Sequence, residues 1–300
     1  MKYSTANVLR LAATVDRLKG QILVLGLAAA LVAAVPASAG NIFLTGHDSD
    51  LHSSGVGSAA TTQVGAAIAF ARGGSTKPVL TFDAGSQLTG ALTFLGIPFT
   101  NVNPNIAATV TDALFSTSIY SAFAVASDTS CGGCDNSPAG EANIAAHGTA
   151  IGAFLNAGGG IVGFAGASSA NYYAFVPQTA SSVGGAPSSG YSQTAVGATV
   201  GIPAVNGDPT HNLFFNPGTN GESAFFQISE VNLTSGNGTI LAPAAVSLIC
   251  SACTVSGGGV ITGGGGGTPA GVPEPTSMFL LGSGLTAVTF FARRKRTSNS

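Results

Sequence analysis

Apolar runs alternate with amphipathic stretches in the first half of the chain. Four short apolar runs predict buried strands, at residues 41–46 (NIFLTG), 78–83, 120–128 and 160–168. Between them, apolar side chains at helical spacing, followed by glycine or proline, predict helices in residues 58–74, 88–104 and 139–160, the second leading into a short strand before Asn103. Strands that alternate with helices of this length predict a parallel sheet covered on both faces.

The predicted fold class is therefore α/β, a doubly wound and mostly parallel sheet of the flavodoxin-like kind. Folds of this class bind ligands at the carboxyl ends of their strands. After Ala170 the pattern loosens into segments rich in Ser, Gly and Pro with short β-like runs, which predicts an irregular, β-rich extension. The exported domain is expected to span residues 40–255.

The helix predicted over residues 139–160 places one histidine on its apolar face. Ile144, His147, Ile151, Phe154 and Leu155 fall on one side of this helix. A histidine among such neighbours is expected to be a hydrogen-bonded core residue rather than a catalytic base.

The stretch from Asn41 to Ala167 resembles the class I glutamine amidotransferase-like fold and its trehalose-utilisation-like relatives. The residues that carry this resemblance are GHDSDLH after the first strand, YSAFAVASD, and FLNAGGGIVGFAGAS. In the enzymes of that group a nucleophilic cysteine occupies the turn that here falls near Ala165. The resemblance therefore implies the fold without glutamine hydrolysis.

Charge is scarce and unevenly distributed. Charged residues make up 7% of the chain, against about 25% in typical soluble domains, which favours a secreted or surface protein. Between Gly40 and Val272 there are ten acids and two cations, so this stretch carries a charge near −8. No basic patch exists there for a phosphate backbone, which argues against nucleic-acid binding.

The N-terminus predicts export. Cations up to Lys19 precede 14 apolar residues and the sequence PASAG, with small residues at Ala37 and Ala39. This pattern is typical of a signal peptide, here residues 1–39, handled by the Sec translocon and signal peptidase. An uncleaved anchor is the alternative, but the apolar run is short for a span of about 20 residues.

The C-terminus predicts a tether and a membrane anchor. Residues 256–271 form a Gly-rich linker, expected to be flexible coil. Residues 276–292 then run for 17 positions without a charge, near the lower limit for a transmembrane helix. The cationic cluster that follows favours a cytoplasmic end over a buried core helix; it consists of Arg293, Arg294, Lys295 and Arg296.

This C-terminal arrangement resembles the PEP-CTERM sorting signal in all three of its parts. The matching residues are a short motif, the apolar helix and the basic tail; the motif consists of Val272, Pro273, Glu274 and Pro275. The resemblance covers residues 272–296 of the predicted sorting segment 272–300 and implies processing by an exosortase in a Gram-negative bacterium that makes exopolysaccharide. It implies a transient anchor in the inner membrane, followed by a cell-surface or extracellular location.

One loop concentrates ligand-type side chains. His47, Asp48, Asp50 and His52 follow the first predicted strand, and His211 could join them. Imidazole and carboxylate groups are ligands for a divalent metal ion. The alternative is a polar loop in which Asp48 or Asp50 caps the following turn or helix. No other cofactor is indicated.

The cysteines occur as two C-x-x-C pairs. An exported chain favours two local disulfides, Cys131 to Cys134 and Cys250 to Cys253. A zinc site with four thiolates and a redox-active pair are the alternatives.

Three functions remain open at this stage. The first is a non-catalytic surface or matrix protein of the biofilm, associated with exopolysaccharide. The second is a metal-dependent hydrolase or carbohydrate-active enzyme that uses the His47 to His52 loop. The third is a carbohydrate-binding module, although five Tyr and no Trp provide few aromatic platforms. A serine hydrolase is not expected, because the G-x-S-x-G motif does not occur.

Overall fold

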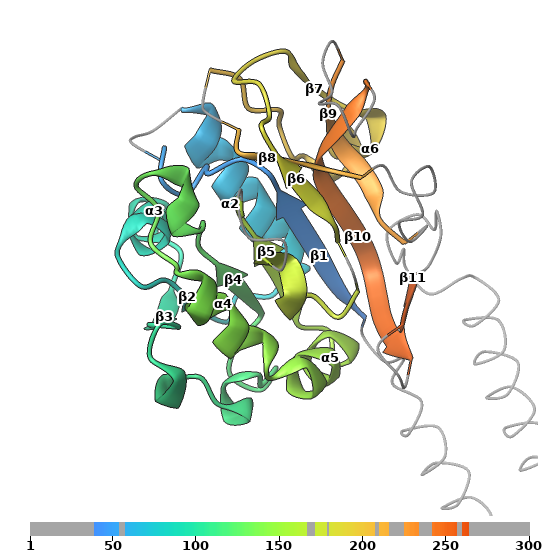
Figure 1. Ribbon diagram of the computed structural model, residues 1–300. Helices are drawn as coiled ribbons and strands as arrows, with labels where there is room; N and C mark the ends of the chain where they lie inside the picture. Colours follow the sequence, from blue (N-terminus) through green and yellow to red (C-terminus); the bar gives the residue numbers. More distant parts are fainter. Residues whose placement is uncertain are drawn as a thin grey trace, which may run out of the picture. The chain divides into compact units, whose positions relative to one another are not determined.

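The computed structural model describes residues 39–53, 58–166, 172–178, 180–207, 210–215, 225–233, 242–256 and 260–263. These residues form a mixed α/β sheet with helices on both faces (Figure 1). The first half contains, in chain order, β1 (Gly40–Thr45), α2 (Ala59–Arg72), β2 (Val79–Phe82), α3 (Gln87–Phe94), β3 (Phe99–Val102), β4 (Ala122–Val125), α4 (Pro138–Ala145), α5 (Gly148–Asn156) and β5 (Gly160–Gly163).

Helix α2 shows why these segments fold as their sequence predicts. The Ser58 hydroxyl accepts a hydrogen bond from the Thr61 amide at 3.0 Å and so caps the first turn. At the other end Gly73 has φ of 56°, a left-handed conformation that glycine adopts without strain. Between them Val64 and Ile68, one turn apart, are buried against the sheet.

The parallel strands lie in the order β3-β2-β4-β5-β1. The chain runs outward from β1 to β2 and β3, then returns through β4 to β5. Right-handed crossovers place the helices of the outward and return paths on opposite faces of the sheet. Accordingly α2 and α3 pack on one face, and α4 and α5 pack on the other. The prediction of helices on both faces is confirmed.

Two details of the predicted class are wrong. In the flavodoxin-like order the first strand lies inside the parallel sheet, whereas here β1 lies at its end, next to β5. The far edge of β1 is paired with an antiparallel strand, β10 (Ala244–Ser256), which Figure 1 shows running alongside it. The sheet is thus mixed rather than mostly parallel.

The second half of the chain supplies the antiparallel part, as the predicted β-rich extension requires. Its elements are η4 (Tyr172–Phe175), β6 (Ser182–Gly184), β7 (Tyr191–Gln193), α6 (Ala195–Val200), β8 (Asn212–Phe214), β9 (Gln227–Asn232), β10 and β11 (Val260–Gly263). Strand β10 pairs with β1, β8, β9 and β11 and so joins the two parts. β11 falls within residues 256–271, so this part of the predicted flexible linker is a strand.

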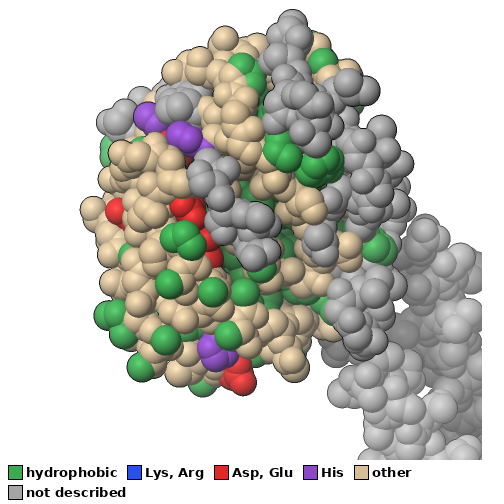
Figure 2. Space-filling view, viewed as in Figure 1, with side chains coloured by type: hydrophobic (Ala, Val, Ile, Leu, Met, Phe, Trp, Pro, Cys, Tyr) green, Lys and Arg blue, Asp and Glu red, His purple; other side chains and the backbone are tan. Residues whose placement is uncertain are grey.

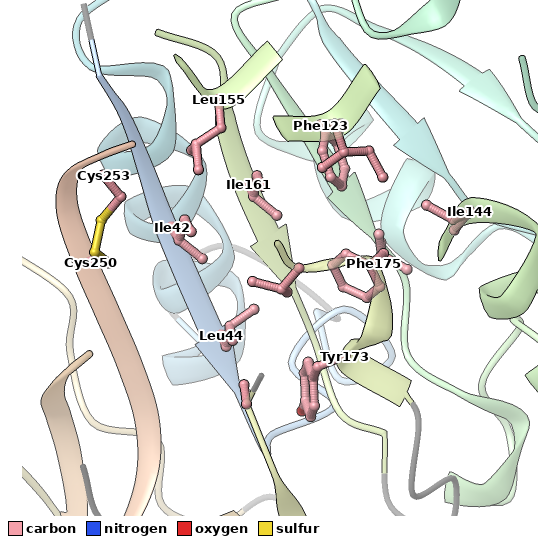
Figure 3. Packing of buried hydrophobic residues seen from close by; sticks show 14 of the residues in the cluster. Ile42, Leu44, Phe123, Ile144, Leu155, Ile161, Tyr173, Phe175, Cys250 and Cys253 are labelled. Atoms are coloured by element: carbon pink, nitrogen blue, oxygen red, sulfur yellow. A yellow bond between two sulfur atoms is a disulfide. The ribbon is translucent and has the colours of Figure 1, made fainter. Parts of the chain in front are cut away.

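The core is divided by the sheet into two layers. On the face of α4 and α5, Ile42 of β1 and Phe123 of β4 pack with Leu155 and with Phe175 of η4 (Figure 3). On the other face, Phe43 of β1 packs with the apolar sides of α2 and α3. Neighbouring residues of one strand thus point into opposite layers, which explains why the parallel strands are apolar on both sides.

The single helix predicted over residues 139–160 is wrong. Helix α4 ends at Ala145 and α5 begins at Gly148. His147 lies at the junction, 23% exposed, where its Nδ1 is 2.6 Å from the Asp112 carboxylate. The chain bends here because His147 leaves the helical conformation, with φ of −96° and ψ of 24°. His147 is therefore not part of the core.

The predicted signal peptide, apart from Ala39, and the predicted segment 276–292 lie outside the described residues, as do the motif and basic tail. In the part of the chain that the structure describes, no helix is long and apolar enough to cross a membrane.

Candidate functional site

The loop after β1 lies at the carboxyl ends of the parallel strands, where the sequence places it. The His47 carbonyl accepts a hydrogen bond from the Ala165 amide after β5, at 3.1 Å. Gly46 contacts the backbone of Asn212 so closely that a Cβ atom at this position would overlap the Asn212 carbonyl. The absence of a side chain at Gly46 thus allows β8 to approach the loop.

His47 is completely buried, and each of its ring nitrogens lies next to a polar side chain. Its Nε2 lies 3.1 Å from a carboxylate oxygen of Glu230, and its Nδ1 lies 2.7 Å from the Thr210 hydroxyl. The ring also meets the edge of Tyr191, with centroids 4.9 Å apart. His47 thus connects the loop to the antiparallel part.

Glu230 on β9 is the centre of this polar network, and the sequence analysis missed it. Besides facing His47, its carboxylate accepts hydrogen bonds from the Val205 amide at 2.7 Å, the Ser247 hydroxyl at 2.7 Å and the Gln63 amide at 3.2 Å. A buried carboxylate is tolerated only when donors surround it in this way. Nothing in the loose pattern after Ala170 indicates such a role.

Asp50 links two loops at the same edge of the sheet. Its carboxylate accepts from the Ser127 amide at 2.8 Å and from the Ser127 hydroxyl at 2.5 Å. Burial raises the pKa of Asp50 to about 7, although the bonds from Ser127 oppose this shift. Asp50 therefore ties the loop after β1 to the loop after β4.

Asp48 is buried beneath two partly exposed histidines. One of its oxygens, Oδ2, lies 3.0 Å from Nε2 of His211 and 3.3 Å from Nε2 of His52. The other oxygen, Oδ1, is buried without a hydrogen-bond partner. Asp48 itself is fully buried, but the His52 and His211 side chains are 33% and 18% exposed.

Figure 2 shows histidine side chains next to acidic ones and no Lys or Arg on the described part of that face. The five residues predicted as ligands thus separate into two groups. His47 and Asp50 are bound inside the protein, whereas Asp48 lies between His52 and His211 near solvent.

Both cysteine pairs form the local disulfides that the sequence favours. Cys131 is bonded to Cys134, with Cα atoms 5.7 Å apart, and Cys250 is bonded to Cys253, with Cα atoms 6.0 Å apart. This pairing contradicts a shared four-thiolate zinc site. The Cys131 and Cys134 sulfurs and a carboxylate oxygen of Asp48 do lie within 4.8 Å of one another.

Two further acids, Glu141 and Asp128, are buried together in the protein. Glu141 of α4 and Asp128 after β4 are 2% and 1% exposed, and their carboxyl groups are within hydrogen-bonding reach of each other. Burial, together with the charge and contact of Asp128, raises the pKa of Glu141 to about 10. Glu141 is therefore neutral at pH 7.

The site aligned with the amidotransferase nucleophile offers no reactive group. Ala165 is buried, and its amide donates to the His47 carbonyl and to the Ser127 hydroxyl. Among the described residues other than glycine, only Ala252 has a positive φ. The strained turn that presents a nucleophile is therefore not formed at Ala165.

Comparison with known proteins identifies the C-terminus. Residues 271–296 match the PEP-CTERM protein-sorting motif. The PEP-CTERM match contains the motif Val272 to Pro275 and the basic tail Arg293 to Arg296, and it supports an exported protein that an exosortase processes for display at the cell surface.

For the remainder of the chain, no curated protein and no solved structure was found to match. The resemblance of the domain to glutamine amidotransferase-like proteins is therefore not confirmed.

Proposed function

We propose that the exported domain is a non-catalytic surface or matrix protein that associates with exopolysaccharide in a biofilm. The observation that carries this proposal is that most of the described acids of the domain are buried. Six of them are at most 2% exposed: Asp48, Asp50, Asp83, Asp128, Glu141 and Glu230. The outer surface is consequently even less charged than the sequence suggests.

A surface of this kind suits a neutral, hydrated polymer. The described cations, Arg72 and Lys77, donate to the backbone carbonyls of Lys77 and Thr117. Hydroxyl groups, such as the exposed side chain of Thr100 on the edge strand β3, remain to contact ligands. These groups form hydrogen bonds with sugar hydroxyls without the desolvation cost of a charge.

Electrophoresis in gels that contain the exopolymer of the host tests this association. The mature protein is expected to be retarded in proportion to the polymer concentration, and equally at low and high salt because few charges contribute. A gel without polymer is the control. Unchanged mobility at every polymer concentration, or retardation that salt abolishes, would contradict the proposal.

Intact-mass measurement of the protein from cells and medium tests the processing. We expect a chain that begins near Gly40 and ends near Pro275 in the wild-type host. A strain without the exosortase should retain residues 279–300. If both strains contain the tail, the C-terminus is a permanent anchor instead.

The second candidate function is a metal-dependent hydrolase or carbohydrate-active protein. The observation in its favour is Asp48, which orients two partly exposed imidazoles, because a histidine held by a carboxylate is a suitable base or ligand. The test is release of new reducing ends from the exopolymer with added divalent metal. The double variant H52A/H211A should abolish such release, whereas a non-catalytic protein shows none before or after the change.

A further inference from the structure

Three segments far apart in the sequence meet at Asp48. They are the loop after β1, the Cys131-Gly-Gly-Cys134 turn after β4, and His211 at the start of β8. We propose that the dithiol form of the chain binds one zinc ion through Cys131, Cys134, Asp48 and His211, and that formation of the disulfide releases it. This site is independent of the proposed association with polysaccharide.

The donor atoms are already close to the spacing that zinc requires. The two sulfurs and the Asp48 carboxylate oxygen lie within 4.8 Å of one another, and His211 Nε2 is 3.0 Å from Asp48 Oδ2. Tetrahedral zinc binds S, N and O ligands at about 2.0–2.3 Å, so its ligands lie about 3.3–3.8 Å from each other. The two sulfurs and the Asp48 oxygen are therefore near this spacing, and His211, which already contacts Asp48, supplies the fourth donor of the proposed site.

An unpartnered atom independently indicates a missing ligand. Asp48 is 0% exposed, yet its Oδ1 has no hydrogen-bond partner. Buried carboxylate oxygens are usually satisfied by donors or by an ion. Within the described residues, Asp48 thus has an acceptor atom without a donor, on the same carboxylate whose Oδ2 lies 3.9 Å from the Cys134 sulfur.

The turn that carries the sulfurs also suits a metal site. Two residues separate Cys131 from Cys134, the spacing common in zinc sites. Gly132 has φ of 88°, a left-handed conformation that lets the turn fold back. Cys131 is partly exposed and His211 is 18% exposed, so an ion can enter from solvent.

The exchange between the two forms balances. A dithiol reductant transfers two electrons and two protons to the Cys131–Cys134 bond and becomes a disulfide itself. Zinc then replaces the two thiol protons, which are released to solvent, because thiolates are the ligand form. In the reverse direction an oxidising disulfide accepts the two electrons, the sulfurs bond to each other, and zinc leaves.

The other cysteine pair provides an internal control. Cys250 and Cys253 have the same spacing, but they are buried in the apolar core beside Ile42 (Figure 3). Among the described residues, Asp48 lies close enough to Cys131 and Cys134 for the three to share a metal ion. Cys250 and Cys253 have no such neighbouring ligand group there. Reduction of Cys250 and Cys253 should create no zinc site.

Cobalt titration of the mature protein, purified without a polyhistidine tag, tests the proposal. After reduction by a phosphine under argon, we expect one Co²⁺ per chain with thiolate-to-cobalt absorption that Zn²⁺ removes. The oxidised protein should give no such absorption. The variants D48N and H211A should each weaken binding at least about 10-fold, and C131S/C134S should abolish it.

Protection from alkylation gives a second measurement that needs no variant. In the reduced protein, zinc should slow alkylation of Cys131 and Cys134, while Cys250 and Cys253 react at the same rate with and without zinc. The proposal is overturned if the reduced protein gives no thiolate-to-cobalt absorption, if D48N and H211A bind as tightly as the wild type, or if zinc protects all four cysteines equally.

Discussion

The carboxyl group of Glu141 contacts that of Asp128 in the protein interior. Asp128 also accepts a hydrogen bond from the Ser130 amide at 2.6 Å, whereas neither oxygen of Glu141 has a donor. The proton of the pair is therefore held by Glu141, whose pKa is raised. Desolvation is the main cause of the raised pKa of Glu141, and the adjacent Asp128 adds to it.

This pair predicts that the protein loses stability as the pH rises. The pKa of Glu141 increases from 4.5 to about 10 on folding, so the folded state binds a proton that the unfolded state has lost. The stabilisation of the folded state by protonated Glu141 is complete below pH 4.5 and is lost progressively up to about pH 10. Over this range the free energy of unfolding falls by at most about 1.4 kcal/mol per pH unit.

The variant E141Q isolates this effect, because glutamine keeps the shape and stays neutral. Urea midpoints measured from pH 5 to 10 should fall less steeply for E141Q than for the wild type. The control is S118A, because Ser118 is exposed and carries no titratable group, so the slope should stay unchanged. Parallel slopes for E141Q and the wild type would contradict the assignment of the proton.

Removing the Glu230 carboxylate is expected to be strongly destabilising. In E230A the Val205 amide, the Ser247 hydroxyl and His47 lose their shared acceptor. Each buried group left without a partner costs about 1–3 kcal/mol, so the free energy of unfolding should fall by roughly 3 kcal/mol or more. Denaturant titration measures this loss.

The variant E230Q is the matched comparison. It keeps one acceptor oxygen at the same place, so its loss should be smaller than that of E230A. A negligible loss for E230Q beside a large loss for E230A would mean that the Glu230 side chain contributes through volume alone and that the network does not hold the two parts of the sheet together.

The Ser127 side chain is expected to fix the loop after β1. Its hydroxyl donates to Asp50 and accepts from the Ala165 amide, so S127A leaves both with one partner fewer. We expect a loss of about 1–3 kcal/mol, measured by denaturant titration. In the control S118A, an exposed hydroxyl bonded to Ser116 is removed, and the change should stay within about 0.5 kcal/mol. Similar losses in the two variants would contradict the role of Ser127.

The first half of the fold was predictable because its information is local. Each parallel strand is a short apolar run, and α2 has a capping serine and a terminal glycine in its own sequence. The break at His147 was not predictable in this way, since apolar spacing continues across it. What ends α4 is the local conformation of His147, whose ring bonds to Asp112, a residue distant in sequence.

The candidate site was predictable only in part, for a related reason. The loop from His47 to His52 is conspicuous because its polar residues are adjacent in sequence. Its partners Glu230 and Thr210 come from the weakly patterned second half and reach it through pairing of β10 with β1 and β9. Such pairing between distant segments leaves no local trace, so the sequence could not show that His47 is bound internally while His211 joins Asp48.

The two disulfides are expected to stabilise the fold by different amounts, although the loop-closure entropy of the unfolded chain is the same for both. Both close loops of the same length, with a sequence separation of 3, so the chain-entropy model assigns about 2 kcal/mol to each. Cys250 and Cys253 are 2% and 0% exposed in the apolar core, whereas Cys131 is partly exposed. The change C250A/C253A therefore also leaves a cavity.

We expect C250A/C253A to lower the free energy of unfolding by about 1–2 kcal/mol more than C131A/C134A, from the lost burial of two sulfur-sized groups. Denaturant titration of both oxidised variants under the same conditions measures this difference, and the shared loop length cancels the entropy of closure. A larger loss for C131A/C134A would mean that the turn beside Asp48, rather than packing around β10, depends most on its disulfide.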